Sequence, residues 1–306
     1  MFAYAKFSRF DFGVFRILGD GLGNLLFPWA RAIIGARKYG LAAIWPTWMQ
    51  FKVGPFLRWE RDKRFYYGLF KPSNEYIAGF KKLWVLANCP RVSEFDFFRN
   101  PCAISSHSIV VFSGMEDYFK DILKDHALVK HELLNIVRRE HNVGINSCRN
   151  SIAVHVRLGD FSIPKEQRYL DINKSGNTNF RLPLEWYIFM VRALRQKLGE
   201  EYEVYVFSDG HDDELAELLA LPNCKRLGFG SSIADLLALS SSYILIASGS
   251  TFSMWASYFG RMPVVWYPGQ LRQRLYYERP NAEIELRQGQ DVPESFIELI
   301  VAHNKL

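Results

Sequence analysis

Arg157 carries the strongest chemical signal in this sequence. It follows an alternating segment, Ser151 to Val156, that predicts a buried strand, and Gly159 and Asp160 come directly after it. In open α/β sheets, ligands bind beyond the carboxyl ends of the strands, so a cation here is well placed to meet an anion. Its guanidinium offers five donors in a planar fork that matches phosphate geometry. A surface ion pair with Asp160 is the alternative, and the local sequence favours neither.

A second anion-binding signal lies at the end of another predicted strand. The segment Ser250, Thr251, Phe252 and Ser253 follows a strand at 243–247 and opens a helix expected at 254–259. Backbone N–H groups at a helix N-terminus, together with hydroxyls, bind anions readily. Plain capping of the helix by Ser or Thr is the alternative.

Two acidic residues and one histidine complete the set in this half of the chain. Asp235 follows Ser232 by three positions, which is close to a capping box, but a carboxylate can also accept two hydrogen bonds from the edge of guanine. Ser208 and Asp209 end the predicted strand at 202–207. His155 lies on the same sheet face as Arg157 by strand alternation, so it either bonds to the site or fills a polar gap in the core.

The N-terminal part contains a glycine-rich turn. An apolar run at 14–18 predicts a strand, followed by Gly19-Asp20-Gly21-Leu22-Gly23-Asn24 and a helix that stops at Gly40. This is the opening unit of a Rossmann-like domain, although Leu26 stands where a dinucleotide motif has its third glycine. A tight βα turn is the alternative. Asp20 adjoins the turn and is our candidate general base, while an exposed turn aspartate explains it equally well.

The predicted elements position these residues in two domains, 1–145 and 146–306, with the boundary in the polar, turn-rich segment 141–150. In the first domain we expect, besides the opening unit, a strand at 108–112 and one or two helices at 116–140. In the second, we expect helices at 183–198, 212–219, 232–239, 254–259 and 293–303 between strands at 151–156, 202–207, 243–247 and 264–267, with a polar loop at 162–179. Such alternation indicates a parallel sheet with helices on both faces.

Composition limits the function classes. The chain has 306 residues, of which 49% are hydrophobic and 23% charged, as in globular proteins, and its net charge of +6 favours an anionic partner. The four cysteines form no Cys-x-x-Cys pair, which argues against a zinc site or a disulfide framework. There is no run of 18 apolar residues and no clean signal peptide, so we expect a cytoplasmic protein.

Residues 45–84 are rich in aromatic and basic side chains. Side chains interleaved in this way could stack on sugars, contact bases or lie at a membrane interface. An aromatic-rich insertion with a solvated basic face is the alternative, and we favour it slightly.

Several of these motifs resemble one family. His155-x-Arg157-x-Gly-Asp160-Phe161 resembles the His-x-Arg-Arg-x-Asp-Tyr motif of the α1,2-fucosyltransferases, with Leu158 in place of the second arginine and Phe161 in place of tyrosine. Four further segments resemble the family's elements in the same order: the glycine-rich turn at 21–27, which departs from the family at Leu25, Leu26 and Pro28, the Phe-Ser-Asp segment at 207–209, the acidic element at 233–237 and the Ser-Thr-Phe-Ser segment at 247–255. Residues 41–140 carry no such motif.

The resemblance implies a GT-B glycosyltransferase, in which two Rossmann-like domains with parallel sheets face each other across a cleft. It implies inverting transfer of fucose from GDP-fucose to a glycan or lipid-linked oligosaccharide, with the donor in domain 146–306 and the acceptor on domain 1–145. Arg157 and Asp20 are the expected catalytic residues. The residues expected to bind the nucleotide sugar are Gly23, Asn24, His155, Arg157, Asp160, Ser208, Asp209, Asp235, Ser250, Thr251, Phe252 and Ser253.

No metal or cofactor is expected, because no Asp-x-Asp pair ends a predicted strand. Three alternatives remain: a transferase for another GDP-sugar, since a motif arginine is missing; a nucleic-acid-binding protein, which would leave the Arg157 and Ser250 turns unexplained; and a catalytically inactive sugar-binding homologue. We expect no nucleic-acid partner, and a cytoplasmic location that allows peripheral contact with the inner face of the membrane.

Overall fold

The computed structural model describes residues 1–57, 63–159, 161–162 and 180–303. The chain forms two compact units, one of residues 1–57 and 63–139 and the other from residue 140 onward. Asp160 and almost all of the predicted loop at 162–179 lie outside the described residues. The expected boundary at 145 and 146, and the roles given to the two domains, stay predictions.

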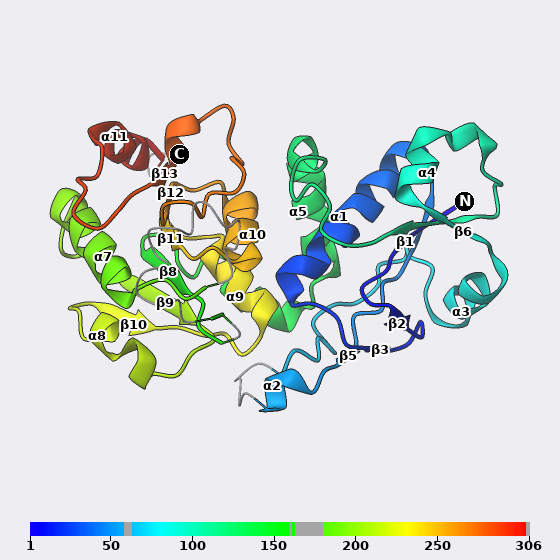
Figure 1. Cartoon of the computed structure of the whole chain (residues 1–306), viewed down its shortest axis with the longest axis horizontal. Coiled ribbons are helices and arrows are strands. Elements are labelled where there is room, and N and C mark those ends of the chain that lie inside the picture. Colours follow the sequence, from blue (N-terminus) through cyan, green and yellow to red (C-terminus); the bar gives the residue numbers. More distant parts are fainter. Residues whose placement is uncertain (58–62, 160, 163–179, 304–306) are drawn as a thin grey trace. The chain divides into compact units, whose positions relative to one another are not determined.

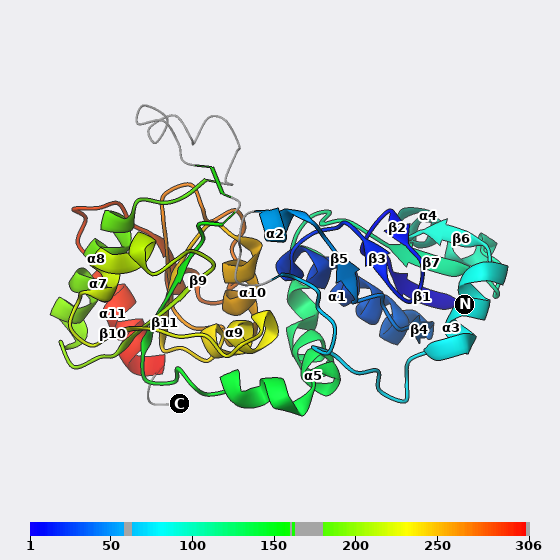
Figure 2. The ribbon, with the colours of Figure 1, turned by 90° about the horizontal axis from the view of Figure 1, so that it is seen from below.

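Unit 1 is built on a four-stranded parallel sheet of order β4-β1-β7-β6 (Figure 1 and Figure 2). Its strands are β1 (Phe2–Ala5), β4 (Ala42–Ile44), β6 (Arg91–Ser93) and β7 (Ile109–Phe112). Helix α1 (Leu22–Tyr39) packs against β1 and β7 through an apolar face that includes Leu26, Trp29 and Ile33. It ends as expected, at Gly40 in the left-handed conformation, with Arg37 and Lys38 in its last turn.

The prediction that residues 14–18 form the opening strand was wrong. The opening strand is Phe2–Ala5, and a hairpin of β2 (Phe10–Asp11) and β3 (Arg16–Ile17) lies between it and α1. The hairpin pairs with β5 (Gln50–Phe51) in a separate three-stranded sheet. The apolar run looked like a core strand, yet most of its side chains are exposed, because hydrophobicity alone does not say which side of a strand faces the core.

Short helices complete unit 1 (Figure 2). These are α2 (Gly54–Leu57), α3 (Gly79–Asn88), α4 (Glu94–Arg99) and α5 (His126–Ile136), with 3-10 turns at Pro101–Ala103 and Leu123–Asp125. A further 3-10 turn, Arg139–Gly144, begins at the last residue of unit 1 and continues into unit 2. Of the one or two helices expected at 116–140, the structure has α5 at His126–Ile136. Asp117 and Tyr118 have positive φ values that a helix excludes, so no helix runs through the start of this segment.

Unit 2 contains a six-stranded sheet whose pairings are all parallel, in the order β10-β9-β8-β11-β12-β13. Its strands are β8 (Ile152–Val156), β9 (Val204–Ser208), β10 (Cys224–Arg226), β11 (Ile244–Ala247), β12 (Val264–Trp266) and β13 (Glu283–Glu285). Its helices are α7 (Leu184–Leu198), α8 (Ala216–Leu219), α9 (Ser232–Leu239), α10 (Thr251–Gly260) and α11 (Glu294–His303), with 3-10 turns at Asp213–Leu215 and Pro280–Ala282.

Numbered within the unit, this strand order is 3-2-1-4-5-6, the order of the Rossmann fold. The central strands β8 and β11 are buried along their whole length, as expected for a parallel sheet with both faces covered. The expected α/β class with a parallel sheet in each half of the chain is therefore confirmed. Strands β10 and β13 were not anticipated, since each is three residues long and carries charged side chains.

No helix in residues 1–57, 63–159, 161–162 and 180–303 is long and apolar enough to cross a membrane.

Candidate functional site

The predicted residues of unit 2 gather where the strand order reverses. From β8 the chain continues to β9 on one side, whereas from its neighbour β11 it continues to β12 on the other side. Open α/β sheets bind ligands in the crevice outside the carboxyl ends of the strands at such a switch point. Arg157 follows β8, Ser248 follows β11, and Asp209 follows β9, so three loops meet at this edge of the sheet.

Arg157 is held by two contacts of different kinds. Its Nη1 atom forms an ion pair with Oδ2 of Asp209 at 2.6 Å, and its guanidinium lies 5.5 Å from the ring centre of Phe161. The side chain is 20% exposed, so a ligand can reach it. Phe161, which stands where the family motif has tyrosine, therefore supports the guanidinium through its ring.

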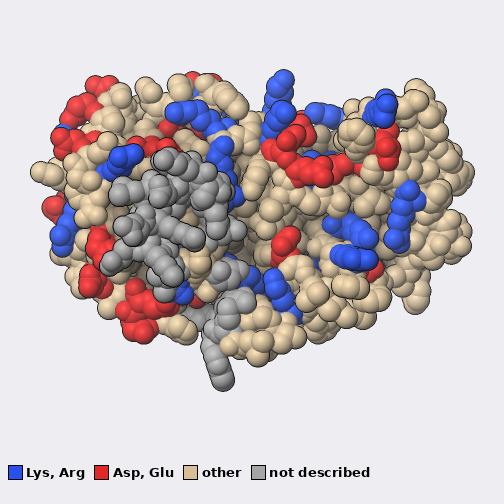
Figure 3. Space-filling model, in the orientation of Figure 1, with Lys and Arg blue, Asp and Glu red and all other residues tan. Residues whose placement is uncertain are grey.

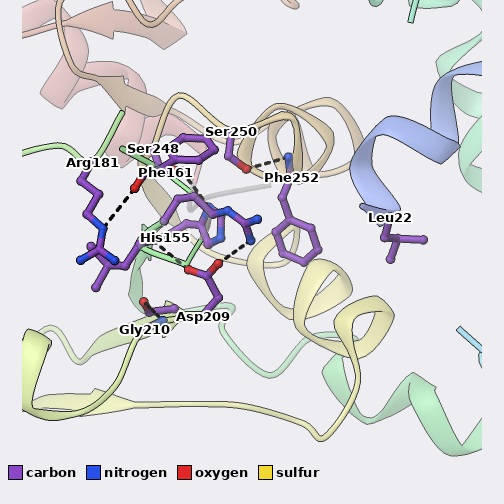
Figure 4. Close-up of polar contacts among 12 residues, drawn as sticks. Leu22, His155, Phe161, Arg181, Asp209, Gly210, Ser248, Ser250 and Phe252 are labelled. Atoms are coloured by element: carbon purple, nitrogen blue, oxygen red, sulfur yellow. Dashed lines mark hydrogen bonds and ion pairs between the residues drawn. The ribbon is translucent and has the colours of Figure 1, made fainter. Parts of the chain in front are cut away.

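Asp209 also fixes the turn that follows β8. Its Oδ1 atom accepts the backbone N–H of Leu158 at 2.8 Å (Figure 4). A Cβ atom at Gly159 would lie 2.4 Å from Oδ2 of Asp209, so this close approach requires glycine. Leu158 itself packs into the core of unit 2, which means that this position presents no cation to the site.

The neighbouring Ser208 serves its own turn. Its hydroxyl accepts the N–H of Gly210 at 3.0 Å, while Arg226 donates to the carbonyls of Ser208 and Gly210. Arg181 donates a hydrogen bond to the carbonyl of Phe161 and forms an ion pair with Glu214 at 2.7 Å. Through Arg181, these contacts connect the loops that follow β8 and β9, on which Arg157 and Asp209 lie.

His155 lies beneath the turn that follows β11. Its Nδ1 atom is 2.7 Å from the hydroxyl of Ser253 and 3.0 Å from that of Ser248, and its ring packs against Phe252 at 5.1 Å (Figure 4). Burial, and to a smaller extent Arg157, lowers the pKa of His155 to about 4, while Asp209 acts in the opposite direction. The imidazole is therefore neutral at pH 7 and joins the two loops.

Helix α10 begins three residues earlier than expected, at Thr251. Ser250 is its N-cap, and the hydroxyl accepts the N–H of Phe252 at 3.0 Å, so the capping alternative describes this side chain correctly. Ser253 is fully buried, with its hydroxyl bonded to Ser248 and His155. Thr251 and Phe252 are partly exposed in the first turn of the helix.

Arg272 is a residue of this site that sequence reasoning missed. Its Nη2 atom donates to the carbonyl of Gly249 at 3.4 Å, in the turn between β11 and α10. It comes from the loop after β12, whose carboxyl end lies next to that of β11. The only available signal was its position after a predicted strand, and that signal requires knowing which strands are neighbours.

Asp235 does not belong to a capping box. The N-cap of α9 is Ser231, whose hydroxyl accepts the N–H of Ala234. Ala234 therefore occupies the third helical position, where a capping box has its acidic residue, and Asp235 occupies the fourth. Its Oδ1 atom accepts the N–H of Phe229 at 2.7 Å, and the Phe229 ring stacks on that of Phe207. The carboxylate thus holds the loop that enters α9.

The remaining predicted residues belong to unit 1. Asp20 is exposed in the turn before α1, Gly23 is buried in the first turn of the helix, and Asn24 donates its backbone N–H to the carbonyl of Gly21. Leu22 donates its backbone N–H to the hydroxyl of Tyr66 at 2.8 Å. The glycine-rich turn therefore opens α1 as expected.

The site in unit 2 has the chemistry of an anion-binding site. Arg157 supplies a guanidinium, and α10 begins at the neighbouring strand end, where a helix N-terminus favours anions, although the N–H of Phe252 is already bonded to Ser250. Arg272 adds a second guanidinium beside the same turn.

Comparison with known proteins gives similarity at the level of structure. No family model matches the sequence, and no curated protein matches it. Solved fucosyltransferases do resemble the structure. NodZ alpha-1,6-fucosyltransferase soaked with GDP-fucose is 14% identical over 88% of this chain and 96% of its own, with a TM-score of 0.44.

Two further structures give similar values. Fucosyltransferase NodZ from Bradyrhizobium is 14% identical over 86% of this chain and 94% of its own, with a TM-score of 0.44. The apo form of POFUT1 is 11% identical over 87% of this chain and 98% of its own, with a TM-score of 0.48. These identities are too low to transfer the role of any residue to this chain.

Proposed function

We propose that this chain is a glycosyltransferase of the GT-B type that transfers fucose from GDP-fucose to a hydroxyl of a glycan or lipid-linked oligosaccharide. The observation that carries the proposal is the placement of Arg157. Its guanidinium is oriented by Asp209 and Phe161 at the switch point of a Rossmann-type sheet, beside the N-terminus of α10. The choice of GDP-fucose as the donor, and of an α1,2 linkage, rests on the sequence motifs that resemble those of the α1,2-fucosyltransferases.

In the proposed reaction, the acceptor hydroxyl attacks C1 of fucose from the face opposite the nucleotide. The bond between C1 and the diphosphate oxygen breaks, and GDP leaves with the electron pair while a base takes the hydroxyl proton. Arg157 and the N–H groups of α10 would stabilise the charge that develops on the diphosphate. Asp20 remains the candidate base, and Asp235 the candidate for recognising guanine.

Arg272 offers an explanation for the missing second arginine of the motif. Leu158 occupies that position and packs into the core, whereas Arg272 brings a guanidinium to the carbonyl of Gly249. We infer that the loop after β12 supplies the cation that the motif lacks. A GDP-sugar other than fucose is the nearest alternative donor.

The test is turnover of GDP-sugars by Arg157 variants. Arg157→Ala should lower the rate of GDP release by about 10²–10³-fold, the scale seen when one preorganised donor is lost. Arg157→Lys keeps the charge but not the planar fork, so it should recover only part of the rate. Since Arg157 is partly exposed, both variants should melt close to the wild type.

The donor substrate is identified by measuring the melting temperature with GDP, UDP, CMP and their sugars. We expect GDP-fucose to raise the melting temperature. Transfer should continue in excess EDTA, because Arg157 and α10 would do the work of a metal ion. A folded Arg157→Ala protein that transfers fucose at the wild-type rate would refute the assignment. Activity that is lost in EDTA and restored by magnesium or manganese would refute the metal-free mechanism.

A further inference from the structure

In the three-stranded sheet of unit 1, apolar side chains face solvent and polar side chains face the interior. Across the paired strands β2, β3 and β5, the residues Phe10, Ile17 and Phe51 are in register and are 49%, 43% and 43% exposed. The adjacent register contains Asp11, Arg16 and Gln50, of which Arg16 and Gln50 are 0% exposed. Apolar side chains therefore face outward and polar ones inward, the opposite of the usual pattern for a sheet with one solvated face.

The exposed apolar row continues into the hairpin turn and α2. Ring centres lie 5.1 Å apart for Phe12 and Phe15, and 5.8 Å apart for Phe15 and Phe51. They lie 6.1 Å apart for Phe51 and Phe65, and 5.7 Å apart for Phe65 and Phe56. We call the whole set the aromatic surface; its exposed members are Phe10, Phe12, Val14, Phe15, Ile17, Leu18, Phe51, Val53, Phe56, Leu57 and Phe65. A contiguous set of this kind marks an interaction site.

The inner row fixes this orientation. Arg16 donates from Nε to the carbonyl of Thr47 at 3.0 Å and from Nη1 to the carbonyl of Leu18 at 3.1 Å. Asp11 accepts the hydroxyl of Tyr4 at 2.5 Å and the N–H of Gly13 at 2.9 Å. A shift of the strand pairing by one residue would turn the phenylalanines inward, but it would also turn Asp11, Arg16 and Gln50 outward and break these contacts. The contacts of the inner row therefore stabilise the register in which the apolar face is exposed.

The charges around the aromatic surface are mainly positive. Among the described residues of segments 6–18 and 50–65, Lys6, Arg9, Lys52 and Lys63 are exposed or partly exposed, whereas the acidic residue Asp11 is bonded to Tyr4 and Gly13. Lys63 lies 5.2 Å from the ring centre of Phe56, and Arg9 is exposed beside Phe10. In the region of β3, β5 and α2, Figure 3 shows mostly uncharged surface, with Lys and Arg and some Asp or Glu near it.

This combination selects one class of partner. The cores of protein interfaces are enriched in aromatic residues but depleted in lysine. Surfaces that lie on membranes instead combine exposed apolar side chains with Lys and Arg, which meet the anionic head groups. We propose that the aromatic surface docks unit 1 on an anionic phospholipid bilayer, with the phenylalanines at the boundary of head groups and acyl chains.

The experiment is flotation of the full-length protein with vesicles of phosphatidylcholine alone or mixed equally with phosphatidylglycerol. The wild type should float with the anionic vesicles and stay below with the neutral ones. The double variant Phe12→Ser/Phe56→Ser should bind at least about tenfold more weakly. The control Phe95→Ser/Tyr277→Ser removes two exposed aromatic side chains elsewhere and should bind as the wild type does.

A third variant tests the charges. Arg9→Gln/Lys63→Gln should weaken binding to anionic vesicles and make it less sensitive to salt. Three outcomes would overturn the proposal: no binding by the wild type, equal binding to neutral vesicles, or equal loss in the control variant. Light scattering that shows a dimer dissociated by Phe12→Ser/Phe56→Ser would assign the surface to a second copy instead. Since GDP-sugar turnover is not measured, the result is independent of the proposed function.

Discussion

At the level of residues, Arg157 and Asp209 form the centre of the proposed site. A carboxylate beside the guanidinium offsets part of its charge, but it also fixes the direction of the fork. Asp209 holds Leu158 N–H with one oxygen and Arg157 with the other, so the turn and the ion pair are one unit. A preorganised donor of this kind costs no reorganisation when charge develops on a leaving group.

Asp235 allows a test of nucleobase recognition at a single atom. Asp235→Asn keeps an oxygen for the N–H of Phe229 but replaces the other oxygen with an N–H₂ group. Facing a guanine donor, that group would leave a hydrogen bond unmade at a cost of about 1–3 kcal/mol, so GDP affinity should fall about tenfold or more at an unchanged melting temperature. Calorimetric titration with GDP measures this.

The comparison variant is Asp235→Ala, which loses the Phe229 contact as well. It should lower both the GDP affinity and the melting temperature. If GDP binds both variants as tightly as the wild type, Asp235 only supports the loop.

His155 should make the protein sensitive to acid. Its pKa is about 4 in the folded protein and about 6.5 when unfolded, so the unfolded chain binds more protons between these values. Stability should therefore fall as the pH drops from about 6.5 to about 4, by up to about 3 kcal/mol. His155→Asn has no such group, and urea unfolding of both proteins at several pH values measures the difference. Equal pH dependence in the two proteins would contradict a neutral buried imidazole.

At the level of elements, the turn after β8 depends on Gly159. The Cβ of an alanine here would lie 2.4 Å from Oδ2 and 3.1 Å from Cγ of Asp209, forcing the carboxylate away from Arg157. Gly159→Ala should lower the turnover number by about 10- to 100-fold, since small displacements of a charge-stabilising group are costly.

The matched control is Gly228→Ala, where an added Cβ meets no atom within 4 Å and the backbone φ is ordinary. That variant should turn over at the wild-type rate. Full activity of Gly159→Ala would show that the contact between Asp209 and Arg157 is dispensable.

At the level of the whole molecule, each of the two units contains a buried apolar cluster of its own. One cluster includes Tyr4, Ile44, Val85 and Ile109, and the other lies on the sheet of unit 2 around β8 and β11. Calorimetry should therefore resolve two unfolding transitions, because each unit can unfold around its own core. GDP at about 100 times its Kd should raise the transition of unit 2 by about 5–10 °C and affect the other less. A single transition would show that the units unfold together.

The sequence by itself determined most of the local structure of unit 2 and supplied the candidate residues of the proposed site. The helix at 232–239 and the buried strand before Arg157 were predicted correctly, because apolar periodicity and strand alternation are properties of a few adjacent residues. The rule that ligands bind at strand ends placed Arg157, Asp209 and Ser250 on candidate loops before any strand neighbours were known.

Only the tertiary structure decided how these residues combine. Asp209 became the partner of Arg157 because β8 and β9 are adjacent, and Arg272 reached Gly249 because β12 lies beside β11. The opening strand was misplaced because residues 14–18 and Phe2–Ala5 are both apolar, and only packing showed which is buried. Pairing between distant strands depends on contacts across the whole unit, which periodicity within one segment does not encode.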